Sequence, residues 1–414
     1  MSENKKIYLT AIFSKISLIL ISVITSALIN RQLGVALKGE YAYITNLVSM
    51  IVVILSFGLG QTYSTYRRKY GTDMLKYFAS LTLVQSVIAF IIAGIFLIAK
   101  NTTYAIVFAL SASGLLKSNF LYYAAIEDIR KRDINNVIYK IVYLVIITAS
   151  YFLFAGSLKT LLLLIFFDDL FVVICTAIAY KFKLSFKGIK KIGIPEIYKL
   201  GFLCMVMHSL MTLNYNLDII FLKKMSTSTM VGLYSVGVNL GNMLWLIPDA
   251  FKDILVNKTS RKDEIEEIVK VTKYSLYFSL IIIIGFVIFG KLFIKIMYGN
   301  EFLESYNCTV ILFVGCLSMI IYKLIHPIYI AKGKQWVVVK ILAVSVLTNV
   351  ILNYMLIPKF NIYGASIASV FSYSVCSIIF LIMFCKEYNI QYKEFFVFKK
   401  GEIKKLARMF IKKN

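Results

Sequence analysis

Long apolar blocks recur along almost the whole sequence, and they constrain the fold more than any other feature. Each block is about 20 residues long, which is the length that an α-helix needs to cross the hydrocarbon core of a bilayer. The mean hydropathy is +0.79 and the charged fraction is 16%, whereas soluble domains carry about 25% charged residues. The sequence therefore predicts an all-α polytopic membrane protein and excludes the classes of soluble enzyme.

We expect twelve transmembrane helices separated by short connections, none of which is long enough to hold a catalytic domain. The expected spans are 7–30, 42–66, 77–99, 103–126, 134–155, 160–180, 199–222, 230–251, 274–297, 306–331, 336–357 and 365–385. This count predicts a transport protein that is not an enzyme.

Basic residues alternate along these connections and predict the orientation. Of the 46 Lys and Arg residues, 32 fall in the N-terminal segment, every second connection and the C-terminal tail, and nine fall in the opposite connections. The positive-inside rule then places both termini in the cytoplasm. The net charge of +25 is explained by this topology, so no nucleic-acid partner is expected. The six cysteines lack CxxC spacing and predict buried free thiols with no metal site.

An internal repeat divides the chain into halves. Residues 39–47 and 232–240 share Gly, Tyr, a small residue, Asn and Leu at an offset of 193, and each stretch opens an even-numbered span. A parallel repeat predicts two six-helix bundles related by a pseudo-two-fold axis along the membrane normal, as in alternating-access transporters. The expected parts are an N-terminal six-helix bundle, a cytoplasmic linker, a C-terminal six-helix bundle and a basic cytoplasmic tail, at 1–180, 181–198, 199–385 and 386–414.

Two further cytoplasmic segments show amphipathic patterns. Residues 252–273 predict a short helix at the membrane interface. In the tail, Ile403, Leu406, Met409 and Phe410 share a helical face beside lysines, which indicates docking on anionic membrane lipids or a solvated basic tail.

Charged residues inside the spans are expensive and are therefore candidate functional groups. With Lys199, Lys291 and Lys295 counted in the adjoining connections, the cations within spans are Lys15, Lys117, Lys140, Lys323 and Lys340. Lys340 is close enough to the interface to snorkel. A cavity lined by the others would attract a pyrophosphate or an acidic sugar and repel cations.

Two of the spans carry candidate functional carboxylates. Asp168 and its neighbour Asp169 point about 100° apart on a helix, so one of them is expected to pair with a buried lysine. Asp218 shares a helical face with Asn214, which indicates either an ion or sugar-hydroxyl site or a structural pair. The repeat offset sets His208 against Lys15, so we expect both to face one cleft and Lys15 to bind a diphosphate.

Several short stretches look like turn or packing signatures rather than catalytic motifs, and together they reach over nearly the whole chain. They are Arg31–Gly34, Gly39–Ala42, Val231–Ser235, Ile247–Pro248, Tyr298–Phe302, Asn349, Asn353–Pro358 and Tyr363–Ala368. With these stretches the sequence resembles the bacterial polysaccharide flippases of O-antigen and capsule synthesis, often called Wzx. This family is part of the multidrug/oligosaccharidyl-lipid/polysaccharide exporter superfamily.

The resemblance implies a flippase that moves undecaprenyl-diphosphate-linked oligosaccharide across the bacterial inner membrane for surface polysaccharides such as lipopolysaccharide. It also implies coupling to H⁺ or Na⁺ through Asp218 or Asp168, no other cofactor, and a polysaccharide polymerase and chain-length regulator as partners. The cleft residues that it favours on this chain are Lys15, Arg31, Arg67, His208, Asn214, Asp218 and Asn239.

Two other readings stay open at this point. A cation-coupled multidrug exporter has the same architecture, although the lysine-rich spans fit it less well. A membrane sugar polymerase or a non-transporting assembly subunit belongs to a different functional class, and a polymerase would be expected to carry a long external loop.

Overall fold

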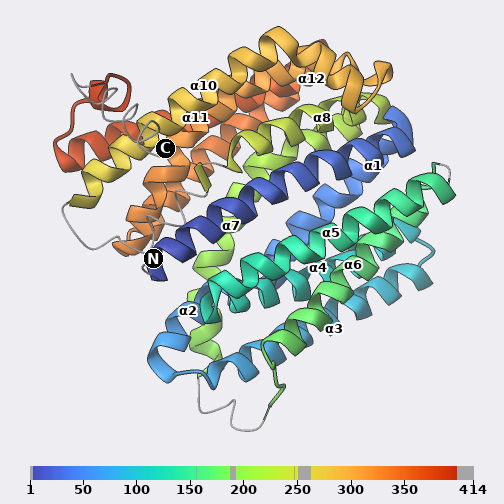
Figure 1. The fold of residues 1–414 in the computed structure, drawn as a ribbon, viewed down its shortest axis with the longest axis vertical. Coiled ribbons are helices and arrows are strands. Elements are labelled where there is room, and N and C mark those ends of the chain that lie inside the picture. Colours follow the sequence, from blue (N-terminus) through green and yellow to red (C-terminus); the bar gives the residue numbers. More distant parts are fainter. Residues whose placement is uncertain (1–2, 155, 187–192, 247, 250–262, 399–414) are drawn as a thin grey trace.

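The structure is a computed structural model of the 414-residue chain. It describes all residues except 1–2, 155, 187–192, 247, 250–262 and 399–414, and it describes the side chains of 13–398 apart from those gaps and 263–264. The described residues form helices and no strands (Figure 1). The α-helices are α1 Glu3–Ser56, α2 Leu59–Tyr70, α3 Met74–Ile98, α4 Thr102–Glu127, α5 Ile129–Leu153, α6 Leu158–Ala179, α7 Ile194–Met225, α8 Ser228–Leu244, α10 Asp263–Met297, α11 Ser305–Ala331 and α12 Gln335–Tyr388, with short 3₁₀ turns at Asn300–Phe302 and Tyr392–Phe395.

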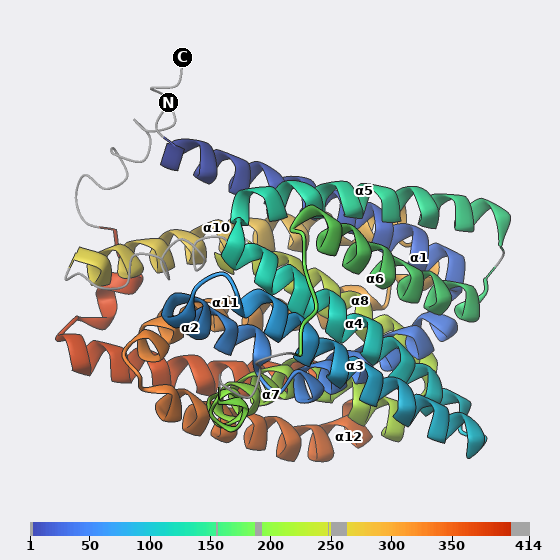
Figure 2. The same cartoon turned by 90° about the horizontal axis from the view of Figure 1, so that it is seen from below.

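Eight helices of the described part are long and apolar enough to cross a membrane. Two of these carry two spans each, because a non-helical residue kinks α1 at Gly34 (φ 66°) and α12 at Asn361 (φ 48°). With α7 and α8, which match the seventh and eighth predicted spans, this layout fits the twelve-helix prediction. Figures 1 and 2 show the long helices running side by side, as a membrane bundle requires.

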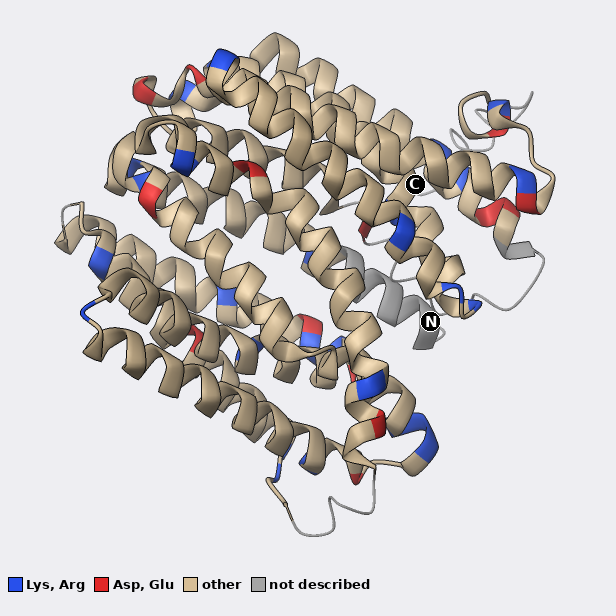
Figure 3. Cartoon of the chain, turned by 180° about the vertical axis from the view of Figure 1, so that it is seen from behind, with Lys and Arg blue, Asp and Glu red and all other residues tan. Residues whose placement is uncertain are grey.

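The helices group into two bundles that follow the chain. In the N-terminal bundle, α4 packs on α1, α3 and α6, while in the C-terminal bundle α11 packs on α8, α10 and α12. The bundles meet where α1 packs on α7 and α8. Charged residues gather toward the two ends of the helices, with few in between (Figure 3).

The first and last described parts of the chain lie at one end of the molecule. Figure 1 shows the start of α1, the end of α12, the α2–α3 turn, the end of α6 and the start of α7 at the same end, and the kink of α1 at the opposite end. An even number of spans requires this arrangement, since both termini must then lie on one side of the membrane.

The repeated motif forms the crossing between the bundles. A Cβ added to Gly39 on α1 would lie 1.8 Å from the backbone oxygen of Ser228, and a Cβ on Gly232 of α8 would lie 2.0 Å from that of Val35. Each glycine also meets the backbone nitrogen of the other. Gly39 and Gly232 are 193 residues apart, and so are Val35 and Ser228. The contact is therefore reciprocal, as a two-fold relation demands.

The boundary between the bundles departs from the predicted one. The helix α7 begins at Ile194, inside the expected linker 181–198, and Ile197 is fully buried against α2, α3 and α4. Gly201 of α7 also meets the backbone of Phe57, and Gly58 meets that of Gly201, so no larger residue fits this approach. The first turns of α7 therefore pack in the N-terminal bundle, and the rest of α7 packs in the C-terminal one.

Two cytoplasmic predictions also change in detail. From Asp263 onward, the segment expected as a separate interfacial helix is the start of α10, with Ile268 and Val269 in the core of the C-terminal bundle. Within the expected tail 386–414, Phe395 is buried and the Tyr277 hydroxyl donates to the Phe396 carbonyl (2.6 Å), so this part is folded onto α10. Residues 252–262 and the amphipathic face at 403–410 lie outside the described residues.

Candidate transport cavity

A cavity of about 550 Å³ lies between the two bundles. Its walls come from α1, α4, α5 and α6 on one side and from α7 and α8 on the other. This volume falls in the range of pockets that hold drug-sized ligands. Four of the predicted site residues line it: Lys117, Lys140, Asp168 and Asn239.

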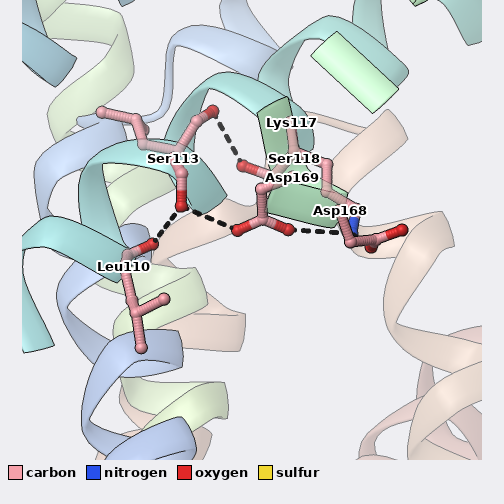
Figure 4. Close-up of polar contacts among 7 residues, drawn as sticks. Leu110, Ser113, Lys117, Ser118, Asp168 and Asp169 are labelled. Atoms are coloured by element: carbon pink, nitrogen blue, oxygen red, sulfur yellow. Dashed lines mark hydrogen bonds and ion pairs between the residues drawn. The ribbon is translucent and has the colours of Figure 1, made fainter. Parts of the chain in front are cut away.

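The charged part of the wall is centred on Lys117 of α4 (Figure 4). Its Nζ lies 2.6 Å from Asp168 Oδ2 and 2.8 Å from Asp169 Oδ1, both on α6. The Ser113 hydroxyl, one turn earlier on α4, lies 2.9 Å from Asp169 Oδ2. The two adjacent carboxylates point in different directions from α6, and the Lys117 ammonium lies between them and contacts both. The predicted pairing of an aspartate with a buried lysine is therefore confirmed.

Two further ammonium groups reach the cavity without a carboxylate partner within 4 Å among the described residues. Lys38 of α1 is 4% exposed and lies over the Tyr41 ring, with its Nζ 4.9 Å from the ring centroid. Lys140 of α5 lies over the Tyr143 ring at 5.3 Å. Aromatic faces stabilise cations only modestly, so both groups can still bind an anion.

The opposite wall is polar and, among the described residues, uncharged. The C-terminal bundle contributes Asn216, Ser235, Asn239 and Asn242 together with apolar side chains. Asn239 is the repeat counterpart of Asn46, which lines the cavity from α1. The cavity therefore lies on the pseudo-symmetry axis, although its charges come from one bundle.

A second polar cluster lies inside the C-terminal bundle around Asp218, which is 1% exposed. Its carboxylate accepts hydrogen bonds from Tyr234 (2.8 Å), Asn349 (2.9 Å), Asn353 (2.6 Å) and the Ser369 hydroxyl. These donors come from α8 and both halves of α12. Asn214, one turn before Asp218, donates to Ser345 on the same face of α12 (2.9 Å).

Three predicted cavity residues instead join elements near the ends of the bundles or within one bundle. Arg31 is exposed and donates to the carbonyl of Met297 at the end of α10 (3.0 Å). Arg67 pairs with Glu127 (2.6 Å) on the N-terminal bundle. Lys323 lies 3.1 Å from both oxygens of Asp249 and stacks on Trp245.

The remaining predicted residues also lie away from the cavity wall. Lys15 on α1 and His208 on α7 are both half-buried and are not among the lining residues, so the cavity does not bring this predicted pair together. Asp218 and Asn214 are buried in the separate cluster. Lys340 is exposed, as its snorkelling interpretation requires.

Sequence reasoning missed Lys38, Tyr41, Tyr143 and Asn46 as cavity residues. The predicted spans place Lys38 in a connection. In the structure the helix continues beyond the kink at Gly34, and Lys38 lines the cavity. Asn46 could have been predicted, since it occupies the same place in the repeated motif as Asn239, which was predicted.

Comparisons with known proteins point to one group. The family described as "Polysaccharide biosynthesis protein" matches residues 127–307. The probable low-salt glycan biosynthesis flippase Agl15 of Haloferax volcanii is 24% identical over 170 residues, which cover 39% of this chain and 36% of that protein. The match thus spans about a third of the length of that relative.

Solved structures share the fold over nearly the whole chain. The lipid II flippase MurJ in an inward closed conformation gives a TM-score of 0.73 at 14% identity, covering 98% of this chain and 91% of that one. The MATE transporter VcmN of Vibrio cholerae gives 0.64 at 13% identity, covering 94% and 97%. The family match and the Agl15 relative confirm the predicted resemblance to the polysaccharide flippases, and the solved structures show the same fold.

Proposed function

We propose that this chain, a multi-pass membrane protein similar to polysaccharide flippases, moves undecaprenyl-diphosphate-linked oligosaccharide from the inner to the outer leaflet by alternating access. The observation that carries this proposal is the cationic cavity between the bundles. The pocket has three lysines, Lys38, Lys117 and Lys140, but only two aspartates beside them, so it holds an excess of positive charge at membrane depth. Because a buried charge without a partner is costly, such a pocket favours an anionic group such as a diphosphate.

Ion coupling fits the Asp218 cluster better than the Asp168 pair. The Asn214 and Asn353 side-chain oxygens are buried there without a hydrogen-bond donor. Orphaned buried acceptors often mark a missing water or ion, and in transporters oxygen groups at such sites bind Na⁺ or H⁺. Asp218 would supply the charge that neutralises the ion, whereas Asp168 is already paired with Lys117.

A multidrug exporter is the second candidate, because MATE transporters share the fold. The excess of lysines in the cavity would repel the cationic compounds that an acidic pocket attracts. On the first proposal the protein lies in the bacterial inner membrane with both termini in the cytoplasm. A polysaccharide polymerase and a chain-length regulator are then candidate partners.

Transport by the purified protein in vesicles tests this proposal. The substitutions Lys38→Gln and Lys140→Gln together should lower translocation of an isoprenyl-diphosphate-linked sugar by about tenfold or more, since charged hydrogen bonds contribute about 1.5–3 kcal/mol each. The exposed Lys359, at the kinked end of the first half of α12, supplies the matched control Lys359→Gln, which should transport at the parental rate.

Protein abundance and thermal melting in detergent should stay near the parental values for both variants, because neither cavity lysine would leave a carboxylate of the described residues buried within 4 Å without its partner. Parental transport by the double variant would contradict the proposal. Export of a cationic dye instead of the lipid would favour the multidrug exporter.

A further inference from the structure

Five polar side chains of the cavity share one hydrogen-bonding pattern. Thr25 and Thr45 on α1 donate their hydroxyl protons to the carbonyls of Ile21 and Tyr41 (2.8 Å each). Ser235 on α8 donates to the carbonyl of Gly232 (2.8 Å). Each of these protons is used inside its own helix, so the hydroxyl oxygen offers only lone pairs to a ligand.

Two asparagines of the wall are fixed in the same sense. Asn46 donates its amide to the Ala42 carbonyl (2.7 Å), and Asn216 donates to the Thr212 carbonyl (2.9 Å). A backbone carbonyl can only accept, so it requires the NH₂ group of the amide to face it. The side-chain oxygen of each asparagine is therefore left as an acceptor for the cavity, beside one remaining amide N–H.

The charges of the described cavity wall are confined to the N-terminal bundle, which also carries Thr25, Thr45 and Asn46. Among the described lining residues, every ionisable cation or carboxylate, Lys38, Lys117, Lys140 and Asp168, comes from the N-terminal bundle. The repeat counterpart of Lys38 is Val231, which is fully buried. The C-terminal bundle thus offers no cation on its described wall to a second anionic group.

We propose that this cavity selects a lipid-linked glycan whose sugars next to the diphosphate are uncharged and rich in hydroxyl or acetamido donors, and that it rejects uronic acids at that position. This inference rests on the proposed function, in which the lysines of the N-terminal bundle bind the diphosphate. The adjoining sugar then lies against a wall of acceptor oxygens.

The physical reason is a mismatch of donors and acceptors. Sugar hydroxyls and an acetamido N–H can each donate to the oxygens of Thr45, Asn46 and Asn216. An ionised carboxylate only accepts, so these oxygens offer it no hydrogen bond. The neutral amide N–H groups beside them do not replace the cation and the hydration that it loses. Rejection by an unpaired group is an established way to build specificity.

Binding to the purified full-length protein in lipid nanodiscs tests this inference with three probes. They are a short-chain isoprenyl diphosphate without sugar, the same lipid carrying N-acetylglucosamine, and the same lipid carrying glucuronic acid. We expect the N-acetylglucosamine lipid to bind about tenfold more tightly than the glucuronic acid lipid. The substitution Asn216→Lys, which adds a cation and donors to the wall, should reduce this preference to less than about threefold, and Asn239→Lys should act in the same direction.

The exposed Asn307 of α11 gives the matched control Asn307→Lys, which should keep the parental preference. Equal binding of the two glycolipids by the parental protein would overturn the specificity while leaving the proposed function intact. Failure of all three diphosphate lipids to bind would overturn the proposed function itself. A preference that survives in both lysine variants would show that these acceptor oxygens do not set it.

Discussion

Lys117 and Lys38 both place an ammonium group in the cavity, but their surroundings give them different roles. Lys117 is held between two carboxylates, and removing it would leave two buried charges without a cation, which is strongly destabilising. Lys38 faces only the Tyr41 ring among its described contacts. Of the two, Lys38 can exchange its surroundings for a ligand at lower cost, so it is the better candidate for direct binding.

Asp218 supports a prediction about ion binding. If the buried acceptors of its cluster hold Na⁺, the ion binds the folded protein and should raise the melting temperature as its concentration increases. We expect the parental protein in detergent to melt a few degrees higher in sodium chloride than in choline chloride of equal ionic strength. Asp218→Asn should abolish that difference, because it removes the charge that compensates the ion.

The matched control for this measurement is Asp249→Asn, since Asp249 pairs with Lys323 in the same bundle but outside the cluster. This variant should keep the response to sodium even if its overall melting temperature falls. An equal sodium response in Asp218→Asn would rule out this cluster as the ion site.

The sequence predicted the kinds of charged group better than their places. The pairing of Asp168 or Asp169 with a lysine follows from the cost of burial alone, and it is observed. The grouping of Lys15 with His208 relied on a sequence offset, which gives equivalent positions in two bundles but not the direction of each side chain. Arg31 shows the same limit, because the carbonyls that it binds belong to the end of α10, 265 and 266 residues away.

At the scale of helices, the crossing of α1 and α8 is as close as two backbones allow. The reciprocal contact of Gly39 and Gly232 leaves no space for a Cβ on either side. Glu40 and Lys223 form an ion pair across the bundles beside this contact, and the Lys223 ammonium donates to Ser228 at 2.7 Å. We therefore expect the crossing and the ion pair to restrict access to the cavity from this end.

We therefore expect Gly39→Ala and Gly232→Ala to loosen this end and to do so about equally. An added methyl group must push the helices apart, at a cost of about 1–3 kcal/mol. The measurement is the rate at which an impermeant maleimide, added from the outer side, labels a cysteine introduced at cavity residue Ser26. Both variants should raise that rate several-fold in a background without the native cysteines.

Two glycines with open surroundings supply the controls. A Cβ at Gly94 of α3 or at Gly285 of α10 would meet nothing within 4 Å, so alanine there should leave the labelling rate unchanged. A response at Gly39 without a similar response at Gly232 would contradict the two-fold reading of this contact.

Helix positions were largely predictable, and helix interruptions were not. Apolar length sets where a span lies, so the spans agree with the helices to within several residues. The break at Phe57 and Gly58 inside the second predicted span, by contrast, comes with the close approach of Gly201 on α7. That approach depends on packing between distant segments, which periodicity along one segment does not encode.

At the scale of the whole molecule, duplication explains the cavity and its asymmetry together. The repeat brings Asn46 and Asn239 to one axis. Among the described residues that line the cavity, however, the charged ones come only from the N-terminal bundle. The common ancestor of the halves could have supplied the symmetric frame, and later divergence the charge. The repeated motif at 39–47 and 232–240 was enough to predict the two-fold arrangement from the sequence. Which wall of the cavity carries the charges could be seen only in the structure.

The orientation of this frame in the membrane is the last prediction. Thr102 begins α4 and Phe360 precedes the kink of α12, and the alternation of Lys and Arg puts both positions outside the cytoplasm. Single cysteines at 102 and 360 should therefore react with an impermeant reagent added to intact cells, whereas cysteines at 188 and 262 should react only in inverted membrane vesicles. The six native cysteines must first be replaced, since Cys175 and Cys204 are only half-buried. Because one alternation fixes all four positions, labelling of 188 or 262 from outside would break the twelve-span topology, and reversal at all four would invert the direction of transport.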